Sequence, residues 1–276
     1  MFDAAQTNTL LHQTLMTTAL VTMAVMIGMW LLSLRLRNAS IIDSYWGPGF
    51  LVISAVAAWS GPELGTRGAL VLALVAVWAI RLGIYLTWRN HGLGEDYRYA
   101  QMRAHHGRRF GAVSLFTVFG LQGFLMWVIS TPLQAAILTP EPGALTALDL
   151  LGAALWCIGF VFETVGDWQL ARFKADPSSR GRVMDRGLWA YTRHPNYFGE
   201  AMVWWGYACL ALATTAGAWT AFGPALMTFL LLKVSGVALL ERGMEQRRPE
   251  YTEYIARTSA FFPWPPKTRS AHAHTS

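Results

Sequence analysis

The residues best suited to chemistry lie in the stretch 182–200, which is polar, basic and rich in turn-forming residues. Pro195 disfavours helical geometry at the residue before it and suits the first turn of a helix that follows. A helix that begins there places Asn196 and Glu200, four residues apart, on one face. Cations beside free N–H groups at a helix start can hold an anionic ligand. The alternative interpretation is a solvated loop before an ordinary helix. The candidate side chains here are Arg182, Arg186, Arg193, His194, Asn196 and Glu200.

Ionisable side chains within apolar runs are the second group of candidates. Each costs on the order of 3 kcal/mol to insert, so each is a site hypothesis. Glu163 and Asp167 lie four residues apart on one helical face, which Lys174 continues. This stripe predicts a polar ligand channel near the basic stretch. The alternative is an internal salt bridge to Arg81 or to a loop arginine.

Two further stripes carry aromatic and polar groups. Arg81 and Tyr85 share a helical face that could stack on a flat ring and bind a phosphate or a carbonyl, although an aromatic belt is the alternative. Asp43 and Tyr45 begin another apolar run, where the Tyr45 hydroxyl could donate to a substrate carbonyl. There the alternative is a helix cap at Asp43 with Tyr45 at the membrane interface.

A final pair of charged residues lies within and just after the last apolar run. Lys233 lies near the middle of that run, and Glu241 follows eight residues later on roughly the same face. We expect these two side chains to form a structural ion pair rather than to take part in catalysis.

The composition places these candidates in a membrane protein. Of 276 residues, 54% are hydrophobic and only 14% are charged, whereas a soluble domain carries about a quarter charged residues. Thirteen tryptophans suit aromatic belts at the membrane surfaces. Neither cysteine belongs to a metal-binding pattern, so we expect no metal site.

Apolar runs of about 20 residues are long enough to span a membrane. They predict an all-α fold, a polytopic bundle of seven transmembrane helices. We expect a single domain over 1–266, with most of the cofactor site in 146–266, and a disordered tail at 267–276. The predicted spans are 14–34, 41–60, 68–88, 111–133, 146–171, 197–215 and 218–240.

The distribution of positive charge predicts the topology. With the N-terminus outside and the C-terminus cytoplasmic, 19 of the 22 lysines and arginines fall in inner segments and one falls in an outer segment. This asymmetry accounts for the net charge of +6 and argues against a nucleic-acid partner.

The motif Arg193-His-Pro-Asn-Tyr-Phe-Gly-Glu200 resembles a membrane superfamily that contains steroid 5-alpha-reductases, sterol reductases and isoprenylcysteine carboxyl methyltransferases. Other motifs favour the steroid reductases within this superfamily: Glu163-xxx-Asp167, Arg81-xxx-Tyr85 and Gly187-Leu-Trp-Ala-Tyr191. The tail from Pro249 to Pro265 resembles that of bacterial relatives of the steroid reductases. The similarity covers most of the chain from about residue 40 and is firmest over 160–265.

The resemblance implies reduction of an enone lipid, such as a 3-oxo-Δ4 steroid, by hydride from NADPH. Lys174 stands where the family has arginine, and Glu163 stands where it has asparagine. The residues that would contact the cofactor by position are Arg81, Tyr85, Glu163, Asp167, Lys174, Arg182, Tyr191, His194, Asn196, Glu200 and Arg257.

This chain differs from the family at the residues that polarise the substrate carbonyl. The family's tyrosine position falls on Trp78, and its glutamate position falls near Tyr45 or Trp46, with Asp43 close by. We therefore expect catalytic roles at Tyr45 first, Asp43 second, and Trp78 in the tyrosine's place. Tyr45 would donate to the carbonyl oxygen as it gains negative charge.

Two alternatives use the same fold. One is a membrane methyltransferase that uses S-adenosylmethionine, and the other is a non-catalytic sterol-binding protein. On the reductase interpretation we expect a monomer in the bacterial inner membrane. Its cofactor site would face the cytoplasm, and its lipid or steroid substrate would enter from the bilayer.

Overall fold

A computed structural model of the chain describes residues 4–61, 63–139, 143–234, 236–237, 241 and 250–267. Those residues form helices and turns, with no strand among them, which confirms the all-α prediction. Two compact units are distinguished: Met1–Leu150 with Tyr207–Gly223, and Leu151–Gly206 with Pro224–Ser276. The single domain remains a prediction, and of the predicted disordered tail only Lys267 lies within the described residues.

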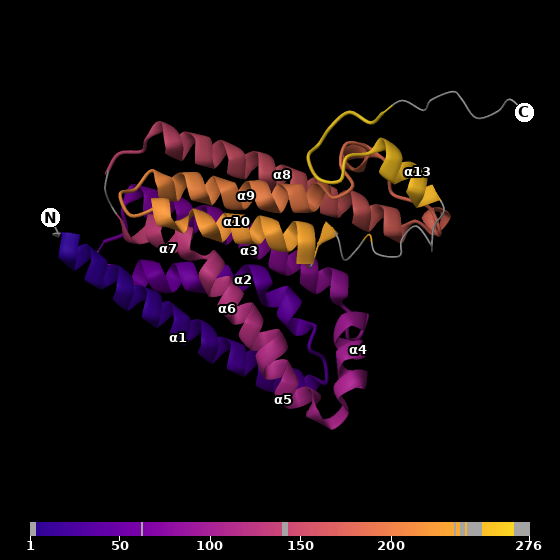
Figure 1. Cartoon of the computed structure of the whole chain (residues 1–276), viewed down its shortest axis with the longest axis horizontal. Coiled ribbons are helices and arrows are strands. Elements are labelled where there is room, and N and C mark those ends of the chain that lie inside the picture. The colour runs from indigo at the N-terminus through magenta and orange to yellow at the C-terminus, as the bar shows by residue number, and fades with distance from the viewer. Residues whose placement is uncertain are drawn as a thin grey trace, which may run out of the picture. The chain divides into compact units, whose positions relative to one another are not determined.

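The first unit contains most of the N-terminal helices (Figure 1). In chain order they are α1 (Ala4–Leu36), α2 (Ile41–Ser60), α3 (Thr66–Asn90), α4 (Tyr97–His106), η1 (Gly107–Arg109), α5 (Phe110–Ser114), the π-helical η2 (Leu115–Gly120), α6 (Leu121–Ile129), α7 (Thr131–Leu138) and η5 (Ala218–Ala221). The helix α4 was not predicted. Its start signal is Asp96, whose carboxylate accepts from the Arg98 N–H at 3.0 Å.

The later helices build the second unit, and three of them, α8, α9 and α10, continue across its boundary in the chain. They are α8 (Ala147–Ala175), η3 (Pro177–Ser179), η4 (Gly187–Ala190), α9 (Pro195–Leu212), α10 (Phe222–Phe229), the π-helical η6 (Leu230–Val234) and α13 (Glu250–Arg257). The predicted start of a helix at Pro195 is confirmed.

Among the described residues, five helices are long and apolar enough to cross a membrane by length and composition, which supports an integral membrane protein. The fourth runs over Tyr97–Ile129 and ends before α7, where Pro132 cannot donate a helical hydrogen bond. The sixth and seventh predicted spans correspond to α9 and to the shorter apolar helix Ala218–Val234. The count of seven spans and the side of each terminus remain predictions.

The core of the first unit is the close packing of α2 against α3. A Cβ on Gly83 would lie 2.8 Å from Pro48 Cγ, and one on Gly47 would lie 3.1 Å from the Ala79 carbonyl oxygen. The absence of side chains at these glycines lets the two backbones approach. Phe50 and Trp78 then pack beside the crossing, fully buried, with ring centroids 5.9 Å apart.

A buried ion pair also ties this unit together. Arg67 Nε donates to Asp149 Oδ1 at 2.6 Å, and Arg67 Nη2 donates to Oδ2 at 2.9 Å. The side chains are 2% and 1% exposed. Thr146 also donates to Asp149 from both its backbone N–H and its hydroxyl, so the carboxylate oxygens are well satisfied.

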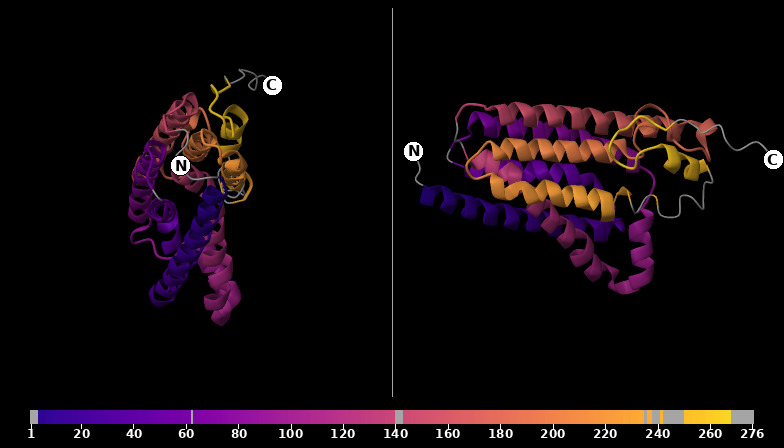
Figure 2. Two further views of the ribbon diagram at one scale, coloured as in Figure 1. Left: turned by 90° about the vertical axis from the view of Figure 1, so that its left-hand side faces the viewer. Right: turned by 45° about the horizontal axis from the view of Figure 1, so that its top comes forward.

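In the second unit, the parts of α8 and α9 that belong to it lie side by side (Figure 2). Glycines line their contact at intervals of seven residues. A Cβ on Gly159 would lie 2.6 Å from the Val203 nitrogen, and one on Gly206 would lie 2.7 Å from the Gly152 oxygen. This glycine seam holds the polar residues of the two helices in register.

Candidate functional site

The first element of the candidate site is the start of α9 beside α8. Asn196 Nδ2 donates to Asp167 Oδ1 at 3.1 Å. The two side chains meet because Gly166 lets α9 approach; its Cβ would lie only 3.1 Å from the Asn196 nitrogen. Asp167 is buried, and so is Glu163 one turn earlier. The structure therefore brings together Asp167 and Asn196, two residues predicted from separate motifs.

Asn196 retains an unused acceptor. Its Oδ1 is buried and has no hydrogen-bond partner among the residues that the structure describes. A buried amide oxygen without a partner loses the free energy of a hydrogen bond, about 1–3 kcal/mol. The chemistry that satisfies it is an N–H or O–H donor from a ligand, such as a carboxamide or a ribose hydroxyl.

Arg193 and His194, the two residues before Pro195, are held by Glu241. Glu241 accepts from Arg193 Nε at 2.7 Å, from Arg193 Nη2 at 3.1 Å and from His194 Nε2 at 3.0 Å. Burial pushes the pKa of Glu241 upward, but these bonds outweigh it and lower the pKa to about 2. Glu241 therefore pairs with Arg193 and His194, and the expected ion pair with Lys233 is not formed.

The remaining donors of Arg193 hold the C-terminal segment. Arg193 Nη1 donates to the carbonyl oxygens of Thr258 at 2.7 Å and Ile255 at 3.3 Å. With Glu241 on its other nitrogens, the guanidinium is occupied by the protein rather than offered to an anion. His194 is also buried, and its ring stacks on Tyr197 with centroids 5.6 Å apart. A cofactor contact at His194 remains a prediction, but Glu241 already holds one ring nitrogen.

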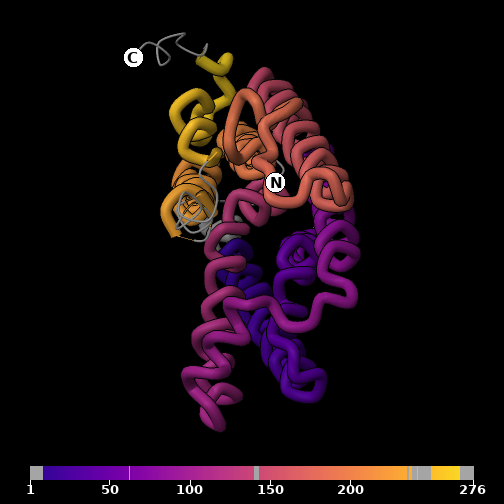
Figure 3. Tube along the Cα trace, turned by 90° about the vertical axis from the view of Figure 1, so that its right-hand side faces the viewer, coloured from indigo at the N-terminus to yellow at the C-terminus, as the bar shows by residue number. Residues whose placement is uncertain are grey.

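The segment 250–264 packs along the loop that precedes α9, as the yellow and orange parts of the tube in Figure 3 show. Thr192 and Ser259 form an isolated parallel bridge, and the Thr192 hydroxyl donates to the Phe261 oxygen at 2.8 Å. The Tyr254 hydroxyl donates to the Trp189 oxygen at 2.6 Å. This segment braces the loop and the start of α9.

The predicted basic contacts lie on the surface of the second unit. Lys174, Arg182 and Tyr191 are exposed, which suits side chains that would meet a charged ligand from solvent. Arg257 is different, because it forms an ion pair with Asp185 and its Nε is buried. Glu200 is half-buried on α9, one turn after Asn196.

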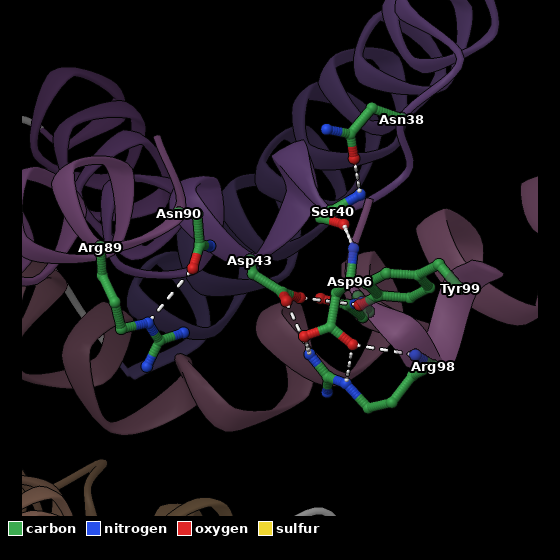
Figure 4. A network of polar contacts seen from close by, with 9 residues as sticks. Asn38, Ser40, Asp43, Arg89, Asn90, Asp96, Arg98 and Tyr99 are labelled. Carbon is green, nitrogen blue, oxygen red and sulfur yellow. Dashed lines mark hydrogen bonds and ion pairs between the residues drawn. The ribbon is translucent and has the colours of Figure 1, made fainter. Parts of the chain in front are cut away.

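In the first unit, Asp43 is the centre of a polar network (Figure 4). Its carboxylate accepts from Arg98 Nη2 and from the Tyr99 hydroxyl, each at 2.7 Å. Arg98 and Tyr99 belong to α4, so these two bonds tie α4 to the first turn of α2, and Arg98 also donates to Asp96. Asp43 is therefore occupied as an acceptor for the protein, which does not favour it as a donor to a carbonyl. Sequence reasoning missed Arg98 and Tyr99 because their partner lies 55 or more residues away.

Tyr45 is placed differently from Asp43. It is half-buried. Trp78 is fully buried against Phe50. On α3, Arg81 Nε and Nη2 are buried, and the Tyr85 ring lies 6.2 Å from that of Trp88. Of the three predicted catalytic residues, Tyr45 has the most available polar group.

An open hollow of about 760 Å³ lies on the same unit. Pro48 from α2 and a face of α3 line it, with Gly83 among the lining residues and the exposed Ile84 and Trp88 along the face. Its lining is mostly apolar. A hollow of this chemistry on a membrane helix suits an aliphatic or ring-fused lipid.

Comparison with known proteins finds a family match over most of the chain and partial matches to enzymes. A family described as "Protein of unknown function (DUF1295)" matches residues 29–258. An uncharacterized protein of Schizosaccharomyces pombe is 24% identical over 262 residues, which are 85% of this chain and 75% of that protein. No solved structure matches the chain.

Two matches concern enzymes. The 3-oxo-5-alpha-steroid 4-dehydrogenase 1 of Bos taurus is 32% identical over 73 residues, which are 26% of this chain and 28% of that enzyme. The human enzyme of the same name is 30% identical over 89 residues, which are 32% of each chain. The chain thus matches less than a third of the length of either enzyme.

Proposed function

The chain belongs to the DUF1295 family, and from that premise we propose that it is a membrane oxidoreductase that reduces the C=C bond of an enone lipid with NADPH. Partial similarity to 3-oxo-5-alpha-steroid 4-dehydrogenase 1 supports the reaction class. The observation that carries the proposal is the Asp167–Asn196 pair, with its buried and unused amide oxygen beside a basic loop. A 3-oxo-Δ4 steroid is the proposed substrate class.

The polar groups of the second unit fit a dinucleotide. Asn196 Oδ1 needs a donor, which a nicotinamide carboxamide or a ribose hydroxyl possesses. Asp167, which accepts from Asn196, orients that amide so that its oxygen rather than its nitrogen is offered to the ligand. The exposed Arg182 and Lys174 would hold the phosphates, since anions need cations or N–H groups.

The first unit offers a group for the substrate. NADPH, when bound, would supply the hydride to the β-carbon of the enone, and the α-carbon would take a proton. Tyr45 would donate its hydroxyl hydrogen bond to the carbonyl oxygen as negative charge develops there. Trp78 is fully buried against Phe50, so its indole has no exposed surface to offer a substrate. Arg98 and Tyr99 hold Asp43, so Tyr45 is the preferred donor.

The first test is ligand binding by the purified protein in detergent. NADPH, NADH and S-adenosylmethionine are compared by their effect on thermal unfolding, since a ligand of the native state raises the midpoint. NADPH is expected to stabilise wild type, and Arg182→Ala and Asn196→Leu are expected to weaken that effect. Arg180→Gln, a nearby exposed arginine, is the matched control. If S-adenosylmethionine alone stabilised the protein, the basic loop would bind that cofactor, and the protein would be a methyltransferase rather than a reductase.

The second test is turnover. Androst-4-ene-3,17-dione and NADPH are incubated with the protein, and the gain of two hydrogens in the steroid is followed by mass spectrometry. Tyr45→Phe removes the donor and keeps the ring, so turnover is expected to fall at least about tenfold while NADPH stabilisation is unchanged. Equal turnover by wild type and Tyr45→Phe would reject this donor. A folded protein that binds none of the three cofactors would favour a non-catalytic sterol-binding protein.

A further inference from the structure

Four exposed arginines lie at one end of the first unit: Arg35, Arg37, Arg108 and Arg109. They come from two separate segments that the fold joins. Trp30 Nε1 on α1 donates to the Gly111 oxygen on α5 at 2.8 Å. A Cβ on Gly111 would lie 3.4 Å from a methyl group of Leu34. The last turn of α1 therefore packs against the start of α5. We call these four residues the arginine cluster.

The acidic groups near the arginine cluster are already used by other arginines. Glu95 accepts from both Nε and Nη2 of Arg103 at 2.8 Å, and these hydrogen bonds lower its pKa below the ordinary value. Asp96 and Asp43 are both paired with Arg98. None of the four arginines of the cluster forms an ion pair with any residue in the described ranges. The cluster has no ion-pair partner among the described residues, and the network beside it sets three carboxylates against two arginines.

Arg37 occupies a backbone position that favours glycine. Its φ is 51°, and it is the one non-glycine residue with positive φ among those that the structure describes. The Asn38 N–H donates to the Ser33 oxygen at 3.1 Å, which is the hydrogen bond of a helix end whose left-handed residue is usually glycine. Gly92, Gly94 and Gly107 take positive φ nearby. An arginine at Arg37 is strained, so its side chain is retained at a cost in backbone stability.

The neighbouring turn is held by three further hydrogen bonds. The Ser40 N–H donates to Asn38 Oδ1 at 2.8 Å, and the Ser40 hydroxyl accepts from the Asp96 N–H at 2.6 Å (Figure 4). The Ala39 N–H donates to Glu95. Arg37 is thus presented next to a hydrogen-bonded connection between α1, α2 and the segment that leads into α4.

The arginine cluster lies at the ends of the apolar parts of two candidate spans, where lipid headgroups would be found. Arg35 lies in the last turn of the candidate span Thr9–Leu36, and Arg37 follows that turn. Arg108 and Arg109 directly precede Phe110, where the apolar part of the span Tyr97–Ile129 begins. Trp30, whose indole links the two segments, is a residue that favours the membrane interface.

We propose that the arginine cluster binds the phosphate of an anionic phospholipid at the membrane surface. Uncompensated arginines next to transmembrane helices attract anionic headgroups, and guanidinium groups bind phosphate oxygens in pairs. The side-chain charge of Arg37 explains why an unfavourable backbone position carries arginine. This site belongs to the first unit alone and does not depend on the reductase proposal.

The test is thermal unfolding of the full-length protein in neutral detergent with added lipid. Mixed micelles with phosphatidylglycerol are expected to raise the unfolding midpoint, and micelles with phosphatidylcholine of the same chains are not. Each arginine removed is expected to lower the apparent affinity for phosphatidylglycerol about fivefold, so Arg108→Gln with Arg109→Gln lowers it about 25-fold. Arg180→Gln in the second unit, which removes one charge elsewhere, is expected to leave the affinity nearly unchanged.

Arg37→Gly separates the lipid role from a structural one. Glycine relieves the positive φ, so in lipid-free detergent this variant is expected to unfold about 2 °C above wild type. Its stabilisation by phosphatidylglycerol is nevertheless expected to fall. A loss of lipid response with a gain in intrinsic stability cannot come from damage to the fold.

Three results would overturn the proposal. Equal stabilisation by phosphatidylglycerol and phosphatidylcholine would show that the charge of the headgroup is irrelevant. A selective response that survives all three arginine substitutions would place the lipid elsewhere. Reproduction of the shift by inorganic phosphate at the same concentration would assign the cluster to a free anion instead of a lipid.

Discussion

Replacement of Glu241 by glutamine is expected to destabilise the second unit strongly. Glutamine keeps the size of the side chain but removes the charge that Arg193 and His194 share. The pKa of Glu241 falls from 4.5 to about 2, which corresponds to about 3 kcal/mol at 1.36 kcal/mol per pKa unit. The carboxylate is 19% exposed, so solvent screens the interaction only slightly.

The same shift predicts a pH dependence. Because folding lowers the pKa of Glu241, its contribution to stability is present above pH 4.5 and is lost as the pH falls towards 2. Wild type and Glu241→Gln should therefore differ most near neutral pH and converge only as the pH falls to about 2 and below. The assay is thermal unfolding in detergent across this range, where 3 kcal/mol corresponds to about 6–12 °C.

A matched control is available on the same segment. Glu250 is exposed at the start of α13, so Glu250→Gln removes the same charge without a buried partner and should change stability by less than about 0.5 kcal/mol. If Glu241→Gln and Glu250→Gln had the same unfolding midpoint at pH 7, the argument from the lowered pKa would be refuted. A difference that did not shrink at low pH would refute it equally.

Two further substitutions test the packing of each unit by the same unfolding assay. Arg67→Ala leaves Asp149 charged and unpaired in the interior and should cost about 3–5 kcal/mol, whereas Arg67→Met combined with Asp149→Leu should recover most of it. Gly199→Ala places a methyl group against the backbone of Gly159, 2.5 Å from its oxygen, and should cost about 1–3 kcal/mol, whereas Gly28→Ala meets no atom within 4 Å and should not destabilise. If Arg67→Ala or Gly199→Ala unfolded at the same temperature as wild type, the stabilising role of the corresponding contact would be contradicted.

Much of the candidate site was visible in short motifs. Asp167 and Asn196 were identified from spacing within their own helices, and the structure joins them by a hydrogen bond. The spacing could not show that Gly166 permits this approach, because a glycine in an apolar run has no local signature of what packs on it. The roles of these residues in cofactor binding remain proposals.

The partners of the buried charges were not predictable in the same way. Glu241 was expected to pair with Lys233, eight residues earlier, and instead holds Arg193, 48 residues away. Asp43 was interpreted as a cap or a donor, and instead accepts from Arg98 and Tyr99. Many arginines could have served either acid, so only the packing of the helices selects among them.

The sequence by itself determined the membrane class, the positions of the long apolar helices and the helix start at Pro195. These follow from hydropathy, helix length and the φ restriction of proline, which act within one segment. Only the tertiary structure decided which charges pair and where Arg37 adopts a strained turn. Those features depend on distances between segments far apart in the chain, and distance sets the free energy of a buried ion pair.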